Sequence, residues 1–124
     1  MSQPSRPKVL IADDERVIAD TLAIILQREG FDVTVAYSGR QALERAQSFQ
    51  PEILISDVIL GEDPVSGIEV ALRVRHLFPA CRVVLFSGQP EADDLLRSAQ
   101  ALGHNFEVLA KPAHPRDLLA CLRR

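Results

Sequence analysis

The sequence predicts an α/β fold in which helices cover both faces of a doubly wound, five-stranded parallel sheet. Five short apolar segments alternate with five longer segments whose apolar residues recur at helical spacing. Several of the short segments are apolar at every position, which is typical of strands that are buried on both faces of a parallel sheet. Because strand and helix alternate throughout, parallel strands joined by right-handed crossovers are the favoured connection.

The predicted strands are short and rich in valine, isoleucine and leucine. They are Val9–Ala12, Val33–Ala36, Ile53–Ser56, Val83–Phe86 and Val108–Ala110. No internal repeat, low-complexity tract or interdomain linker separates them, and 124 residues are the size of one domain. We expect this domain to span residues 8–124, preceded by a flexible tail at residues 1–7, which lacks the apolar stretch of a signal peptide.

A predicted helix follows each strand. The first helix carries one apolar stripe, formed by Val17, Ile18, Thr21, Leu22, Ile25 and Leu26. We expect it to end at Gly30, since glycine is common just past a helix C-terminus. Ala42, Leu43 and Ala46 indicate a second helix that stops before Pro51.

The remaining three helices have clearer end signals. The third is predicted from about Ser66 to Leu77, before Pro79, with Ile68, Ala71, Leu72 and Val74 facing inward. The fourth spans about residues 91–102, is acidic at its start and is closed by Gly103. The last begins near His114-Pro115 and carries leucine at positions 118, 119 and 122.

Composition excludes several classes of function. Hydrophobic residues make up 47% of the chain and charged residues 25%, and the net charge of −3 comes without a basic stripe, so we expect no nucleic-acid partner. No apolar run approaches the roughly 20 residues that a membrane span needs. Cys81 and Cys121 match no metal-ligand spacing and lie in apolar surroundings. We interpret them as small buried hydrophobic residues in a reducing cytoplasm.

Polar side chains follow four of the five predicted strands. Asp13 and Asp14 come after the first strand, Asp57 after the third, Ser87 after the fourth and Lys111 after the fifth. The carboxyl ends of parallel strands lie at one edge of a sheet, where ligands bind in doubly wound folds. The sequence therefore predicts that three carboxylates, a hydroxyl and an ammonium meet there.

Each of these residues has an ordinary structural explanation when it is taken alone. Asp13 or Asp14 could cap the first helix, Asp57 and Ser87 could open turns, and Lys111 could be a solvated charge. Four of five strands ending in this set of groups are not readily explained by chance. We therefore favour a functional site over four separate structural roles.

The residue types in this cluster indicate phosphoryl chemistry on the protein itself. Clustered carboxylates repel one another unless a cation joins them, and a hard divalent ion such as Mg²⁺ suits oxygen ligands. A hydroxyl and an ammonium that face the same point suit phosphoryl oxygens. The chain contains no GxxxxGK[ST] loop for a nucleotide. We therefore predict that a carboxylate of the protein is the nucleophile that accepts the phosphoryl group.

The sequence resembles the receiver domain of two-component response regulators, the family that includes the chemotaxis response regulator. The matching stretches are "VLIADDE", "ILISDVIL", "VVLFSG" and "LAKP", at the spacing that the family shows. Together they cover nearly the whole chain, from Lys8 to the last helix. The resemblance implies a flavodoxin-like sheet with strand order 2-1-3-4-5.

The resemblance also implies a role for each acidic residue. Asp57 would accept a phosphoryl group from a phosphohistidine on a sensor histidine kinase or phosphotransfer protein. Asp14 and Asp57 would bind Mg²⁺ directly, together with the backbone carbonyl of Ile59. Asp13 would reach the metal mainly through water.

The remaining groups would bind the phosphoryl group. Lys111 would pair with Asp57 and then with a phosphoryl oxygen, and Ser87 would move to donate a hydrogen bond to it. The bond between Lys111 and Pro112 would be cis. The contact surface that responds would be the fourth helix, the fifth strand and the fifth helix.

Three features depart from the family pattern. The loop after Asp57 is about two residues longer than usual before Gly67, and it has Gly61 where proline is common. The loop before the lysine is longer by about one residue. The usual aromatic switch position is occupied by Val108, and Phe106, two residues earlier, is the candidate for that role.

We therefore expect a phosphoryl-accepting signalling switch that is not an enzyme beyond its own phosphorylation and dephosphorylation. A single-domain regulator in the cytoplasm is favoured over a fragment, acting on an unknown downstream protein as a monomer or a phosphorylation-dependent dimer. The alternative is a flavodoxin-like interaction module that is never phosphorylated. A phosphatase with an aspartate nucleophile is disfavoured, because Ile59 stands where the second acid would be needed.

Overall fold

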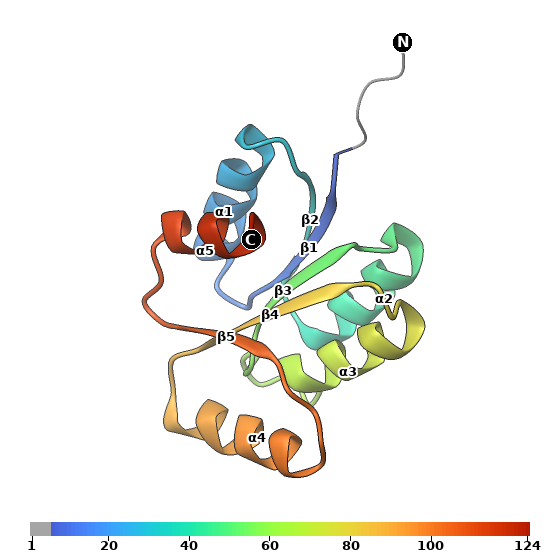
Figure 1. Cartoon of the computed structure of the whole chain (residues 1–124), viewed down its shortest axis with the longest axis vertical. Coiled ribbons are helices and arrows are strands. Elements are labelled where there is room, and N and C mark those ends of the chain that lie inside the picture. Colours follow the sequence, from blue (N-terminus) through green and yellow to red (C-terminus); the bar gives the residue numbers. More distant parts are fainter. Residues whose placement is uncertain (1–5) are drawn as a thin grey trace.

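The computed structural model describes residues 6–124 and confirms the predicted architecture (Figure 1). Its five strands are β1 (Lys8–Ala12), β2 (Asp32–Ala36), β3 (Ile53–Asp57), β4 (Arg82–Ser87) and β5 (Glu107–Ala110). They form one parallel sheet in the order β2-β1-β3-β4-β5. The helices are α1 (Arg16–Arg28), α2 (Gly39–Phe49), α3 (Gly67–Leu77), α4 (Pro90–Ala101) and α5 (Pro115–Leu122).

Most of the tail predicted for residues 1–7 lies outside the described residues. The carbonyl of Pro7 accepts a hydrogen bond from the backbone N–H of Asp32 at 2.9 Å, so backbone pairing reaches one residue beyond β1. No helix within residues 6–124 combines the length and apolar character that crossing a bilayer requires.

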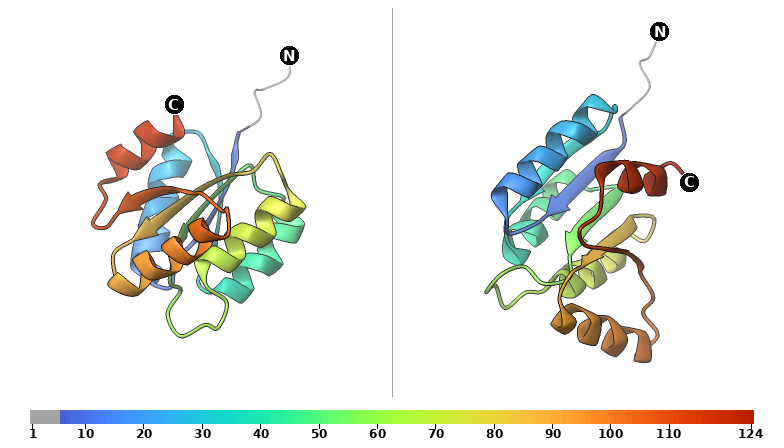
Figure 2. Two further views of the ribbon diagram at one scale, coloured as in Figure 1. Left: turned by 60° about the horizontal axis from the view of Figure 1, so that its bottom comes forward. Right: turned by 90° about the vertical axis from the view of Figure 1, so that its left-hand side faces the viewer.

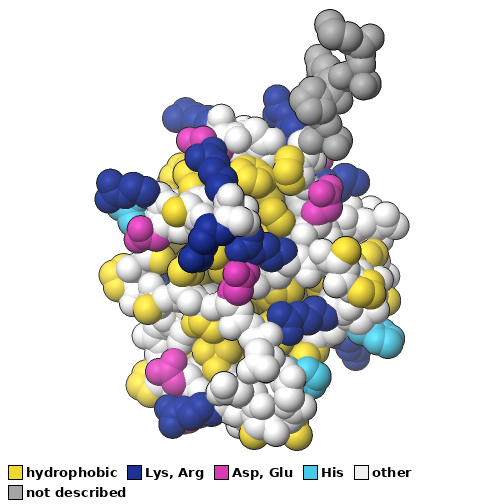
Figure 3. All heavy atoms as spheres, in the orientation of Figure 1, with side chains coloured by type: hydrophobic (Ala, Val, Ile, Leu, Met, Phe, Trp, Pro, Cys, Tyr) yellow, Lys and Arg dark blue, Asp and Glu magenta, His cyan; other side chains and the backbone are white. Residues whose placement is uncertain are grey.

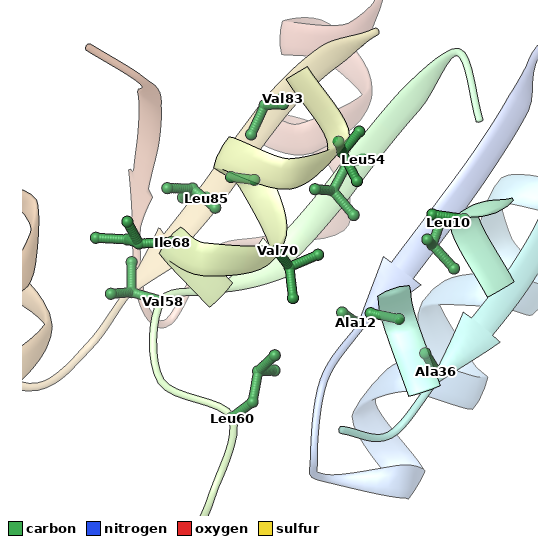
Figure 4. Close-up of a cluster of buried hydrophobic side chains, with 14 of the residues drawn as sticks. Leu10, Ala12, Ala36, Leu54, Val58, Leu60, Ile68, Val70, Val83 and Leu85 are labelled. Atoms are coloured by element: carbon green, nitrogen blue, oxygen red, sulfur yellow. The ribbon is translucent and has the colours of Figure 1, made fainter. Parts of the chain in front are cut away.

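The two faces of the sheet bury separate hydrophobic clusters. Helices α1 and α5 cover one face, and α2, α3 and α4 lie on the other (Figures 1 and 2). Figure 4 shows the cluster on the second face, where Leu54, Val83 and Leu85 of the sheet pack beneath Ile68 and Val70 of α3. Burying one such side chain contributes roughly 1.5–3 kcal/mol, so these clusters hold the sheet edge in place.

Two strands, β3 and β4, run one residue further than predicted at the edge where the polar residues gather. Asp57 is the last residue of β3 and Ser87 is the last residue of β4, paired with Phe86 and Ala110 of the neighbouring strands. Sequence reasoning assigned both residues to the loops. Because they lie in the ladder itself, the sheet fixes their backbone positions.

Only part of the apolar stripe predicted on the first helix packs on the sheet. Helix α1 buries Ala19 and Ala23, which lie outside the stripe, together with Leu26 of the stripe. Val17 is 79% exposed and Ile18 43% exposed, so only one member of the stripe is fully buried. Figure 3 shows hydrophobic side chains at the surface in the region of α1 and α5.

A glycine at the start of α3 allows the helix to approach the end of β3. Ser66 caps α3 by accepting a hydrogen bond from the N–H of Glu69 at 3.2 Å, and Gly67 donates to the carbonyl of Val58 at 2.8 Å. A Cβ atom at position 67 would overlap the backbone carbonyl of Asp57. Position 67 therefore has no room for a side chain, although its φ is not positive.

We expect Gly67→Ala to destabilise the fold by about 3 kcal/mol, because the carbonyl that it meets belongs to a sheet ladder and cannot move freely. Gly30→Ala is the matched control: Gly30 has φ of +97° with open space around its Cβ position, so this change introduces backbone strain alone. Strain of this kind costs about 1–2 kcal/mol. Urea denaturation would compare the free energies of unfolding, and equal losses would contradict the close-approach argument.

Candidate functional site

The candidate site lies at the carboxyl edge of β1, β3, β4 and β5. Backbone hydrogen bonds continue one residue past the strands: Asp13 N–H donates to Ala36 at 3.1 Å, and Lys111 N–H donates to Ser87 at 2.8 Å. The structure thus places all five predicted residues at this edge and brings together the side chains of Asp13, Asp14, Asp57 and Lys111. Their side chains start from backbone positions that the sheet holds.

The three carboxylates form a compact group. Asp13, Asp14 and Asp57 each offer a carboxylate oxygen, and these oxygens lie within 4.8 Å of one another. Asp13 and Asp57 are 5% and 6% exposed, whereas Asp14 is exposed to solvent. A group of hard oxygen ligands with this spacing can hold a divalent cation.

Neither of the paired acids caps α1. The residue at the cap position is Glu15, whose side chain makes no capping hydrogen bond. Asp13 Oδ1 instead accepts a hydrogen bond from the Glu15 N–H at 2.9 Å, which turns the chain just before the helix. The simple helix-cap explanation therefore does not account for the acid pair.

Lys111 joins two of the three carboxylates. Its Nζ donates a hydrogen bond to Asp57 Oδ2 at 2.8 Å and lies 3.7 Å from Asp13 Oδ2. The lysine stem lies close over Gly88, where an added Cβ would come within 2.9 Å of the Lys111 Cβ. A glycine after Ser87 therefore leaves room for the lysine, and the peptide bond from Lys111 to Pro112 is cis.

One oxygen of Asp57 has no partner. Within residues 6–124, Asp57 Oδ1 is the one buried side-chain oxygen or nitrogen without a hydrogen bond. The pKa of Asp57 is raised to about 7, mainly by burial. The hydrogen bond from Lys111 lowers this pKa, and the negative charge of Asp13 raises it. Burial lowers the pKa of Lys111, but the hydrogen bond to Asp57 and the negative charges of Asp57, Asp13 and Glu15 together outweigh this effect, so the net shift is upward. The site thus has too little positive charge to offset its carboxylates.

A polar pocket of about 380 Å³ opens over the carboxylates. Asp14, Asp57, Ile59, Gln89 and Lys111 are among the residues that line it. A second, larger hollow of about 560 Å³ adjoins it and shares Lys111 with it. The apolar stripe of α1 forms one wall of this second hollow, and the β5–α5 loop (residues 111–114) forms the opposite wall. We call this second hollow the α1 groove.

Ser87 does not face the polar pocket. Its Oγ donates a hydrogen bond to Asp93 Oδ1 in the first turn of α4 at 2.7 Å, and Ser87 is absent from the pocket lining although Phe86 and Gly88 are part of it. Sequence reasoning missed Asp93. The only signal for it was the acidic start of the fourth helix.

The longer loop after Asp57 is tied down at its far end. Asp63 Oδ1 accepts a hydrogen bond from the N–H of Val65 at 2.7 Å, and Asp63 Oδ2 accepts one from the N–H of Arg40 at the start of α2 at 3.5 Å. Gly61 has φ of +63° and lies close to Asp14. The extra residues thus form the protruding loop in Figure 2.

Phe106 precedes β5 and packs against the core cluster beside α3. The Arg75 guanidinium lies 4.2 Å from the centre of its ring, and Arg75 also donates a hydrogen bond to the carbonyl of Asn105 at 2.8 Å. Val108, at the usual aromatic position, is 42% exposed on the edge strand. A switching role for Phe106 stays a prediction.

Comparison with known proteins agrees with this geometry. A family model described as the response regulator receiver domain matches residues 9–123. The transcriptional regulatory protein CreB of Escherichia coli (strain K12) is 35% identical over 118 residues, which is 95% of this chain and 50% of CreB. The chain therefore spans about half the length of this curated relative.

Solved structures with the same fold cover the whole domain. The chemotaxis protein CheY4 of Vibrio cholerae is 30% identical, with a TM-score of 0.79 and coverage of 97% of this chain and 98% of CheY4. The receiver domain of NtrX from Brucella abortus is 26% identical, with a TM-score of 0.79 and coverage of 94% and 95%. With its acid cluster at the expected sheet edge, the chain belongs to the response regulator receiver domain family of two-component signalling systems.

Proposed function

We propose that this receiver domain is switched by a phosphoryl group that Asp57 accepts from a phosphohistidine of a sensor histidine kinase or phosphotransfer protein. The observation that carries the proposal is the state of the Asp57 carboxylate: it is buried at the central strand end, with one oxygen bonded to Lys111 and the other without a partner among residues 6–124. In the transfer, an Asp57 oxygen forms a bond to phosphorus as the N–P bond of the donor breaks. The donor imidazole leaves with the electron pair.

Mg²⁺ suits the carboxylate group. Three clustered carboxylates and one ammonium leave an excess of negative charge, and the buried Asp57 oxygen has no donor within residues 6–124. As the family resemblance implies, Asp14 and Asp57 would hold the ion with the Ile59 carbonyl, and Asp13 would act through water. When bound, the ion would offset the charge of the carboxylates and of the incoming phosphoryl oxygens.

The other residues at the pocket hold and orient the phosphoryl group. Lys111 is placed to pair with a phosphoryl oxygen once Asp57 is phosphorylated, because its ammonium already lies against that carboxylate. Ser87 would turn to donate its hydroxyl proton. Ile59 lines the pocket with an apolar side chain that cannot activate water, so we propose no catalytic turnover beyond the chain's own phosphorylation and dephosphorylation.

We propose that the donor protein docks in the α1 groove. The donor's phosphohistidine must reach Asp57, and the groove is continuous with the polar pocket through Lys111 and Gly88. Its α1 wall presents Val17 and Ile18, which are exposed and without a partner within the described chain. Apolar surface of this kind beside a reactive group suits a protein partner. Both cysteines are buried and unpaired, which suits the reducing cytoplasm where we place this exchange.

Asp57→Asn should abolish phosphorylation and leave the fold intact, because an amide cannot act as the nucleophile but has nearly the same shape. Treatment with acetyl phosphate and Mg²⁺, followed by intact-mass spectrometry, would show one phosphoryl adduct on the wild type and none on the variant. A wild type that takes no phosphoryl group would instead support the unphosphorylated interaction module.

Adding Mg²⁺ to the metal-free protein should raise its melting temperature, and the increase should be larger at pH 8 than at pH 6. The folded pKa of Asp57, about 7, lies above its ordinary value of 3.8, so the folded state binds the extra proton between these values. The contribution of Asp57 to metal-free stability therefore falls as pH rises from about 4 to about 7. Below pH 7 the metal must also displace that proton. Thermal melts with Mg²⁺ or EDTA at each pH measure the shift in melting temperature.

The same melts separate the two neighbouring acids. Asp14→Ala should reduce the Mg²⁺-dependent shift more than Asp13→Ala, because losing a direct ligand costs more than losing one that acts through water. An unchanged melting temperature at saturating Mg²⁺ in the wild type would count against the metal site. Equal losses in the two variants would contradict the assignment of direct and indirect ligands.

Val17→Glu should slow phosphotransfer from a phosphorylated sensor kinase at least about tenfold, by placing a charge in the apolar groove, which corresponds to roughly 1.4 kcal/mol. Labelling by acetyl phosphate, which needs no docking surface, should be unchanged. Ile24→Glu is the matched control, since Ile24 is 50% exposed on the same helix but does not line the groove. Equal effects of both variants on the kinase reaction would remove the groove from the proposal.

A further inference from the structure

The hydroxyl of Ser87 is engaged by a carboxylate on α4. Ser87 ends β4 and is only 8% exposed, whereas Asp93 lies on the first turn of α4, beyond Gly88 and Gln89. Their 2.7 Å hydrogen bond joins a strand end to a helix start across this short connection. Among residues 6–124 the Asp93 carboxylate forms no ion pair, so this hydroxyl is its one side-chain partner.

A serine hydroxyl carries one proton and can donate one hydrogen bond. In the structure, Asp93 receives that proton and holds the Ser87 side chain out of the polar pocket. A phosphoryl oxygen on Asp57 would need the same proton. The two acceptors therefore exclude each other.

We propose that Asp93 is a regulatory residue that competes with the phosphoryl group on Asp57 for the hydroxyl proton of Ser87. This inference rests on the proposed function of Asp57. Without the phosphoryl group, the bond to Asp93 keeps Ser87 turned away and fastens α4 to the sheet. With the phosphoryl group, Ser87 turns into the pocket and Asp93 is released.

Helix α4 makes few buried contacts with the rest of the fold, so its position depends on the bond between Ser87 and Asp93. Its fully buried residues are two alanines, Ala92 and Ala99, and Leu96 is only partly buried against the core cluster. Its cap residue, Gln89, makes no side-chain capping bond, and Leu95 and Leu102 are 39% and 79% exposed. A helix held by so few contacts opens at low free-energy cost. Release of Asp93 therefore loosens the surface that a downstream protein would read.

The competition works in both directions. If the phosphoryl group weakens the Ser87–Asp93 bond, that bond must by linkage weaken the binding of the phosphoryl group to the same extent. Removing the Asp93 carboxylate should therefore favour the phosphorylated form. Its negative charge near the pocket acts in the same direction, so the experiment must separate the hydrogen bond from the charge.

The test measures the apparent affinity of the chain for beryllofluoride, a phosphoryl mimic, in the presence of Mg²⁺, by thermal-melt titration. Asp93→Ala should bind about tenfold more tightly than the wild type, since a charge-assisted hydrogen bond no longer has to be broken. Asp93→Asn keeps an acceptor for Ser87 and should fall between the two. Asp94→Ala removes the same charge one residue away, from a carboxylate that faces Arg97 rather than Ser87, and should change the affinity less than about twofold.

Two further measurements identify the route of the effect. In a Ser87→Ala background, Asp93→Ala should no longer change the affinity. In the free protein, amide hydrogen exchange in the first two turns of α4 should be faster in Asp93→Ala than in the wild type, and adding beryllofluoride should speed it in the wild type alone.

Three outcomes would overturn the inference. They are equal affinities of Asp93→Ala and Asp94→Ala, an effect that persists without Ser87, and exchange in α4 that does not change. If the wild type binds no beryllofluoride, the proposed function fails and the competition fails with it. If the wild type binds it but Asp93→Ala binds it equally, only the competition fails.

Discussion

The contact between Lys111 and Asp57 is the interaction on which the rest of the site depends. A carboxylate at the end of the central strand is buried, which raises its pKa to about 7, and the lysine ammonium at 2.8 Å offsets part of the burial cost. This contact constrains position 88, where a side chain would meet the lysine stem. Position 67 is constrained separately, because a side chain there would meet the backbone carbonyl of Asp57.

The side chains of the core stabilise the fold, whereas the side chains of the site are arranged unfavourably. On both faces of the sheet, apolar side chains are buried against helices, and each such contact supports the same architecture. At the carboxyl edge, three carboxylates crowd together, and one buried oxygen has no partner in the described part of the chain. The stability of the core offsets the unfavourable crowding of these carboxylates. The crowded carboxylates therefore remain available to bind a cation and to accept a phosphoryl group.

The polar pocket lies between two surfaces with different anchoring. The α1 groove, on one side, is built on a helix whose small residues pack tightly against the sheet, so it offers a firm surface to a donor. Helix α4, on the other side, is held by two buried alanines, by the partly buried Leu96 and by the bond between Ser87 and Asp93. An event at Asp57 can therefore leave the donor side unchanged and still alter the side that α4 presents.

The order and type of all ten elements were predictable from the sequence, because apolar periodicity and end signals such as Gly30 are local properties of the chain. The gathering of Asp13, Asp14, Asp57, Ser87 and Lys111 was predictable too, since parallel strands place their carboxyl ends at one edge. The tertiary structure alone decided that the α1 stripe faces a groove, that one Asp57 oxygen has no donor among the described residues, and that Ser87 bonds to Asp93. These features depend on which side chains from distant elements come within hydrogen-bonding or packing distance, and a one-dimensional pattern does not contain those distances.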